Sequence, residues 1–139
     1  MKRLLQESFE LALERDDDFP RLFYDILFHR HPDIEALFGE RGRGRNSLDA
    51  QRRMFAHTLI AIVDRIDDDA WLEATLVPLG KEHAAYGTTE PMYAPVCDAL
   101  ITALAEVCAA DWTPEHEAAW REGYQRIAGF MLRGAAEGG

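Results

Sequence analysis

The chain has 139 residues, the length of one ordinary domain. Its 25 acidic and 15 basic side chains give a net charge of -10 at pH 7, so most of the surface would repel nucleic-acid phosphates and anionic lipid headgroups. Gln6, Glu7 and Glu10 interrupt the N-terminal stretch, and no apolar run reaches the length of a membrane span. We therefore expect one cytoplasmic domain, residues 1–139, that binds neither nucleic acid nor membranes.

Apolar residues recur at helical spacing along nearly the whole chain, and no window alternates between apolar and polar residues, so we expect an all-α fold. The pattern predicts a first helix over 2–15 and, after three aspartates, a second over 19–29. The second helix is apolar almost all round and must be buried on several sides. A short helical turn from Pro32 to Phe38 comes next, followed by an Arg/Gly-rich connection over 39–45.

The second half of the chain continues this helical pattern. Ser47 can cap a helix over 48–66, and the next helix ends at Gly87, where a left-handed cap costs least. Another helix begins near Pro91, and the last one opens at Thr113. The final glycine- and alanine-rich residues, 134–139, are expected to fray.

The two cysteines lie on the helix that begins near Pro91. Cys97 and Cys108 are eleven residues apart, which separates them by about 16 Å along a helix. They cannot form a disulfide with each other, and a reducing compartment fits this composition.

One histidine lies on an apolar helical stripe. Leu72, Leu76 and Leu79 are spaced by four and three residues, and His83 takes the next position. A neutral imidazole there is either part of the core, with its N–H bonded to a carbonyl, or an axial metal ligand. Periodicity alone favours the core role.

Other chemistry has little support in the sequence. The serines, Ser8 and Ser47, lie outside any Gly-x-Ser-x-Gly motif, and His116-Glu117 lacks the second histidine of a zinc protease because Trp120 takes its place. Neither a Gly-x-Gly-x-x-Gly motif nor a phosphate-binding Walker loop is present.

Three polar residues, by contrast, occupy inward positions on three different helices: Tyr24, Gln51 and His83. A buried polar group without a hydrogen-bond partner costs about 1 to 3 kcal/mol. The three positions together indicate a common occupant.

The order and spacing of several residues resemble the globin family, most of all bacterial single-domain globins and the haem domain of flavohaemoglobins. The similarity covers nearly the whole chain and rests on Phe23, Tyr24, Pro32, Leu37, Phe38, Gln51, Leu79, Gly80, His83, Tyr86, Gly87, Tyr93, Trp120 and Tyr124. This resemblance implies a three-over-three helical globin fold that encloses a haem.

The same resemblance implies roles for individual residues. His83 would be the proximal ligand of the iron of haem b, and Phe38 would pack on the haem face. The other cofactor-binding residues that it implies are Phe55, Leu79, Tyr93, Val96 and Ile127.

On the opposite, distal face the resemblance places Tyr24 and Gln51 as hydrogen-bond donors to a gaseous ligand. If the preceding connection shifted the register by one residue, Ala50 would take the place of Gln51. Donors aimed at bound dioxygen stabilise its developing negative charge, so reversible dioxygen binding is implied. In flavohaemoglobins such a pair accompanies the conversion of nitric oxide to nitrate.

The sequence departs from that family in two respects. It ends at Gly139, so we expect no reductase domain, and turnover of nitric oxide would need an external electron donor. The glutamate that supports the proximal histidine in the family is replaced by Ala135, although Tyr93 matches the other member of that network. Without this carboxylate the imidazole is less basic, which weakens the case for peroxidase chemistry.

Two alternatives stay open on the sequence alone. One is a globin that senses a gas and signals to a partner protein. The other is a haem-free scaffold with a globin-like fold.

Overall fold

The computed structural model describes residues 1–39 and 48–138, and the side chains of residues 1–36 and 53–137. In these ranges the helices are joined by turns and loops and no strand occurs, which confirms the predicted all-α class. The α-helices are α1 (Lys2–Arg15), α2 (Phe19–Arg30), α3 (Pro32–Gly39), α4 (Leu48–Asp64), α5 (Asp69–Ala85), α6 (Tyr93–Cys108) and α7 (Pro114–Gly138). Two short 3-10 helices, η2 (Glu90–Met92) and η3 (Ala109–Asp111), flank α6.

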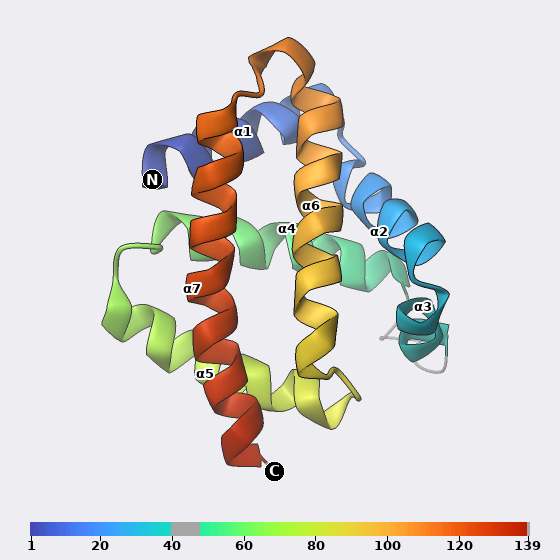
Figure 1. The fold of residues 1–139 in the computed structure, drawn as a ribbon, viewed down its shortest axis with the longest axis vertical. Coiled ribbons are helices and arrows are strands. Elements are labelled where there is room, and N and C mark those ends of the chain that lie inside the picture. Colours follow the sequence, from blue (N-terminus) through green and yellow to red (C-terminus); the bar gives the residue numbers. More distant parts are fainter. Residues whose placement is uncertain (40–47, 139) are drawn as a thin grey trace.

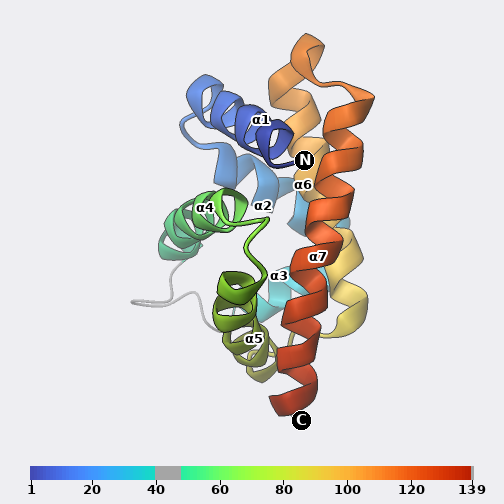
Figure 2. The same cartoon turned by 90° about the vertical axis from the view of Figure 1, so that its left-hand side faces the viewer.

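The helices are arranged in two layers. Figure 1 shows α6 and α7 side by side and running in opposite directions, with α4 and α5 crossing behind them. The side view in Figure 2 shows α1, α4 and α5 on one side of the molecule and α6 and α7 on the other. Because α2 packs against α6, it completes the second layer, and the result is the expected three-over-three arrangement.

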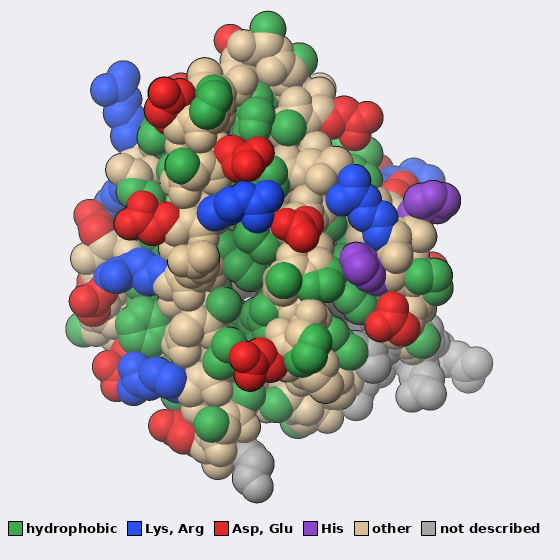
Figure 3. Space-filling model, viewed as in Figure 1, with side chains coloured by type: hydrophobic (Ala, Val, Ile, Leu, Met, Phe, Trp, Pro, Cys, Tyr) green, Lys and Arg blue, Asp and Glu red, His purple; other side chains and the backbone are tan. Residues whose placement is uncertain are grey.

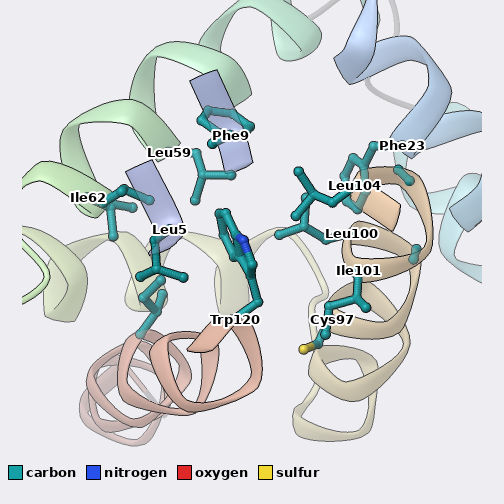
Figure 4. Close-up of a cluster of buried hydrophobic side chains, with 14 of the residues drawn as sticks. Leu5, Phe9, Phe23, Leu59, Ile62, Cys97, Leu100, Ile101, Leu104 and Trp120 are labelled. Carbon is teal, nitrogen blue, oxygen red and sulfur yellow. The ribbon is translucent and has the colours of Figure 1, made fainter. Parts of the chain in front are cut away.

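Trp120 on α7 lies at the centre of the core between the two layers. Figure 4 shows its indole among side chains from other helices, including Phe9, Leu59 and Leu100. The Phe9 ring meets the indole edge-on, with centroids 6.1 Å apart. The indole Nε1–H donates to Ser8 Oγ over 2.8 Å, so this buried polar group is paired inside the core.

The surface carries both signs of charge despite the net excess of acid. On the face formed by α6 and α7, Figure 3 shows Lys and Arg side chains interspersed with Asp and Glu, and hydrophobic side chains visible between the two helices. Several of these charges pair across helices: Arg121 with Asp98 at 3.1 Å, and Arg133 with Glu73 at 3.3 Å. Such exposed pairs contribute little to stability, about 0 to 1 kcal/mol each.

The chain end differs from the sequence-based expectation. Residues from 134 onward were expected to fray, but α7 continues to Gly138, and Gly134 is buried against α5. For residues 134–137 the prediction was wrong, because the small residues that follow Leu132 allow a close helix contact here and do not mark the end of packing.

A second difference concerns the segment that contains α6. The helical stretch Glu90–Asp111, 22 residues with a mean hydropathy of 1.4, is long and apolar enough to cross a membrane by length and composition alone. The sequence had been expected to contain no apolar run of membrane-spanning length. In the fold, α6 packs against α1 and α2 and buries Leu100 and Leu104, as a core helix does.

Candidate functional site

The C-terminal end of α5 is held by local backbone hydrogen bonds around His83. Gly87 adopts φ 101°, the left-handed region expected for it, and its N–H donates to the Ala84 carbonyl over 3.0 Å. The next N–H, of Thr88, donates to the carbonyl of His83 itself over 3.0 Å. The turn that carries His83 is therefore closed off by a glycine cap directly after it.

The imidazole of His83 has a defined orientation. Its Nδ1 lies 2.8 Å from the carbonyl oxygen of Leu79, one turn earlier on α5. A carbonyl can only accept, so Nδ1 carries the proton and donates it, and Nε2 keeps its lone pair. A histidine whose second nitrogen donates to a backbone carbonyl has the arrangement found in metal-binding histidines.

His83 lines a cavity of about 270 Å³ between the two layers. All of α2 to α7 contribute to its wall. The predicted site residues that the structure brings together around it are Tyr24, Phe55, Leu79, His83, Tyr93, Val96 and Ile127. The side chains of Phe38 and Gln51, and of the alternative Ala50, lie outside the described residues. Their roles stay predictions, as do the roles of the residues that line the cavity.

Several lining residues were not singled out from the sequence. Met54, Thr58, Thr88 and Met92 all face the cavity. Thr58 lies one turn after Phe55, so helical spacing could have identified it. Thr88 and Met92 lie between α5 and α6, where no periodic pattern exists. Met54 is 60% exposed and therefore sits at the mouth of the cavity.

Aromatic rings fix the position of Tyr24. Its side chain is only 6% exposed, and its ring centroid lies 5.5 Å from that of Phe28 and 5.7 Å from that of Phe55. Phe55 in turn stacks on Phe23, with centroids 4.6 Å apart and planes 6° apart. This packing restricts the phenol of Tyr24 to one place in the cavity wall.

On the α6–α7 side, two more tyrosines line the cavity. Burial raises the pKa of Tyr93, and burial together with the nearby Cys97, Tyr93 and Asp98 raises the pKa of Tyr124. Both phenols therefore stay neutral at physiological pH. Burial also raises the pKa of the Cys97 thiol to about 11; Arg121 lowers it and Asp98 raises it further.

The cavity suits an apolar group that needs one nitrogen ligand. Among the described lining residues there is no Asp, Glu, Lys or Arg, and the imidazole of His83 is the basic nitrogen that faces the cavity. No carboxylate in the described part of the chain contacts that imidazole, and Glu137, two residues after Ala135, is exposed. These residues fit a haem, which needs one axial imidazole and an apolar pocket.

The sequence of the whole pocket region matches a known family. The globin family model matches residues 21–131, which include most of α2, all of α3 to α6 and most of α7. The chain belongs to the globin family. Globins bind haem, and membership implies haem-based binding of gaseous ligands. The predicted fold class is thereby confirmed.

Individual globin-containing relatives share a quarter to a third of their aligned residues with this chain. It is 24% identical over 130 residues to a flavohemoprotein of Rhodopirellula baltica, an alignment that covers 94% of this chain and 31% of that protein. It is 31% identical over 126 residues to flavohemoprotein B of Dictyostelium discoideum, with 91% and 29% covered. It is also 30% identical over 114 residues to globin, polymeric component P3, of Glycera dibranchiata, with 77% and 74% covered. The chain thus spans about a third of the length of these flavohemoproteins.

Proposed function

We propose that this globin holds haem b through His83 and binds dioxygen reversibly. The observation that carries the proposal is the hydrogen bond from His83 Nδ1 to the Leu79 carbonyl, because it leaves the Nε2 lone pair for iron. When bound, haem iron supplies a coordination position for a small gaseous ligand.

Tyr24 and Gln51 are the proposed hydrogen-bond donors to that ligand. Tyr24 supports this role by lining the cavity with a ring that is packed between Phe28 and Phe55. A phenol donates a stronger hydrogen bond in an apolar site than in water, because no solvent screens it. The apolar wall formed by Phe23 and Phe55 keeps water away from the same space.

Conversion of nitric oxide to nitrate is a second proposed function. It is supported by the place of Tyr24 in the cavity and by relatives that are named flavohemoproteins. The net reaction joins one nitric oxide to one dioxygen and takes up one electron to give nitrate. A separate cytoplasmic reductase is the proposed donor of that electron.

The first test is an absorption spectrum of the purified chain and of two histidine variants. We expect a strong Soret band and an oxygenated ferrous form in the wild type, and loss of both in His83→Ala. His57→Ala is the matched control, because His57 is exposed on α4 and does not line the cavity. Unchanged pigment and gas binding in His83→Ala would refute the proposal. Protein that gains no Soret band on addition of haem would establish the haem-free alternative.

A second measurement separates the gas-related functions. Nitric oxide added to the oxygenated protein together with an electron donor for the haem should give many nitrates per haem if the chain catalyses the conversion. A yield of no more than one nitrate per haem would leave storage as the function. A gas sensor would instead show ligand-dependent hydrogen exchange on its surface helices.

A further inference from the structure

The backbones of α5 and α7 meet at two glycines. A β-carbon on Gly80 would lie 1.9 Å from the carbonyl oxygen of Met131, and a β-carbon on Gly134 would lie 1.8 Å from the carbonyl oxygen of Val77. Both distances are far below van der Waals contact. Because the opposing atoms belong to helical backbone, they cannot rotate away as a side chain would. Each helix thus presents a glycine to the backbone of the other.

Other glycines on α7 lack this kind of contact. A β-carbon on Gly129 would meet nothing within 4 Å, and one on Gly123 would meet only side-chain atoms, the nearest a methyl group of Leu5 at 3.1 Å. A glycine inside a helix costs about 1 kcal/mol relative to alanine. At Gly134 this cost is explained by the close approach of α5, whereas at Gly129 no neighbouring atom requires a glycine.

The contact lies within the turn that carries the proposed iron ligand. Gly80 follows Leu79, whose carbonyl accepts the proton of His83 Nδ1, and it precedes His83 by three residues, about 4.5 Å along the helix. On the other helix, the residue that meets Gly80 is Met131, which also lines the cavity. One backbone contact thus joins the turn of His83 to the cavity wall.

We propose that Gly80 and Gly134 are positioning residues for the iron ligand, because their backbone contact sets where the imidazole of His83 stands relative to the wall formed by α7. This inference rests on the proposed role of His83. A methyl group at either glycine must push α5 away from α7, and the turn from Leu79 to His83 must move with α5. Packed helices respond by a shift of the whole element rather than by local deformation.

The test compares three alanine variants of the full chain loaded with haem. Gly80→Ala and Gly134→Ala each add a methyl group at the contact, and Gly129→Ala adds one on the exposed side of α7. We expect both contact variants to shift the iron–imidazole stretching frequency in resonance Raman spectra and to lose haem about tenfold faster, the rate change that 1.4 kcal/mol produces. Gly129→Ala should match the wild type in both measurements.

A purely structural role predicts a different outcome. Gly134→Ala would then unfold at lower temperature while its iron–imidazole frequency and haem loss stayed at the wild-type values, and this result would overturn the proposal. Arg133→Gln provides a second control, because it removes the exposed ion pair with Glu73 that joins α7 to α5 and leaves the glycine contact in place. It should leave the iron–imidazole frequency unchanged.

A measurement on the wild type keeps the proposal testable if the contact variants do not fold. In the haem-free chain, the contact should protect the amides from Gly80 to His83 against hydrogen exchange about as well as those of α7 around Met131. Exchange at the rate of an unstructured peptide would overturn the proposal. Failure of the proposed function is recognised separately, by unchanged pigment in His83→Ala.

Discussion

The carbonyl oxygen of Leu79 lies 2.8 Å from Nδ1 of His83. Within the described part of the chain, this is the hydrogen bond that orients the imidazole. A peptide carbonyl is a weaker acceptor than a carboxylate, so it draws less on the Nδ1 proton. The ring therefore keeps the character of a neutral imidazole. That character suits reversible gas binding better than chemistry that needs strong electron donation to iron.

A carboxylate introduced on α7 near His83 should change the reduction potential of the haem iron and its bond to the imidazole. Ala135 is half-buried and holds the position where the resemblance expects a glutamate. We expect Ala135→Glu to raise the iron–imidazole stretching frequency and to lower the reduction potential of the iron, on the order of 60 mV for a tenfold change in the equilibrium. Ala136→Glu, at the exposed neighbouring position, is the control. Equal potentials in the two variants would show that position 135 does not reach the imidazole.

Removing the hydroxyl of Tyr24 should weaken dioxygen binding while the packing is kept. Tyr24→Phe preserves the ring contacts with Phe28 and Phe55 but removes the proposed donor. We expect dioxygen to dissociate about tenfold faster, since a hydrogen bond contributes roughly 1 to 1.5 kcal/mol. Stopped-flow measurement of dissociation from the ferrous protein tests this. Tyr86→Phe is the control, because Tyr86 is 49% exposed and does not line the cavity.

The sequence predicts most of the proximal part of the site because its signals are local. The leucine stripe before His83 and the glycine cap at Gly87 lie within a few residues of one another, and the structure has both. By helical spacing Tyr86, three residues after His83, would continue the same stripe, but α5 ends at Ala85 and this side chain is 49% exposed. One residue at a helix end is enough to change the face on which a side chain lies.

The distal part of the site and the α5–α7 contact depend on distant segments. Thr88 enters the cavity from a connection without periodicity, and the register of Gln51 depends on the length of the preceding connection. The close approach at Gly134 has no sequence signal of its own, because a glycine inside a helix shows only that a side chain is missing. These features depend on where two helices cross, and no short stretch of the sequence contains that information.

The hydrogen bond between Trp120 and Ser8 should contribute to the stability of the core. Ser8→Ala leaves the buried indole N–H without a partner, which costs about 1 to 3 kcal/mol. For a chain of this length we expect the melting temperature to fall by roughly 3 to 10 °C. In a Trp120→Phe background the same change should cost much less, because no N–H is left to satisfy. Thermal unfolding of the four proteins measures this coupling, and purely additive effects would contradict it.

The Cys97 thiol should make the protein less stable in alkaline solution. Burial raises its pKa from 9.0 to about 11, so the folded chain holds the proton more tightly than the unfolded chain does. The stabilisation from the neutral thiol is therefore complete below pH 9.0 and is lost as the pH rises through about 11. Cys97→Ala removes this contribution and keeps the other groups that lose a proton at high pH, such as the phenol of Tyr124. We expect the difference in urea midpoint between wild type and Cys97→Ala to shrink as the pH rises from about 8 to about 11. A constant difference across that range would show that the thiol titrates alike in the folded and unfolded chains.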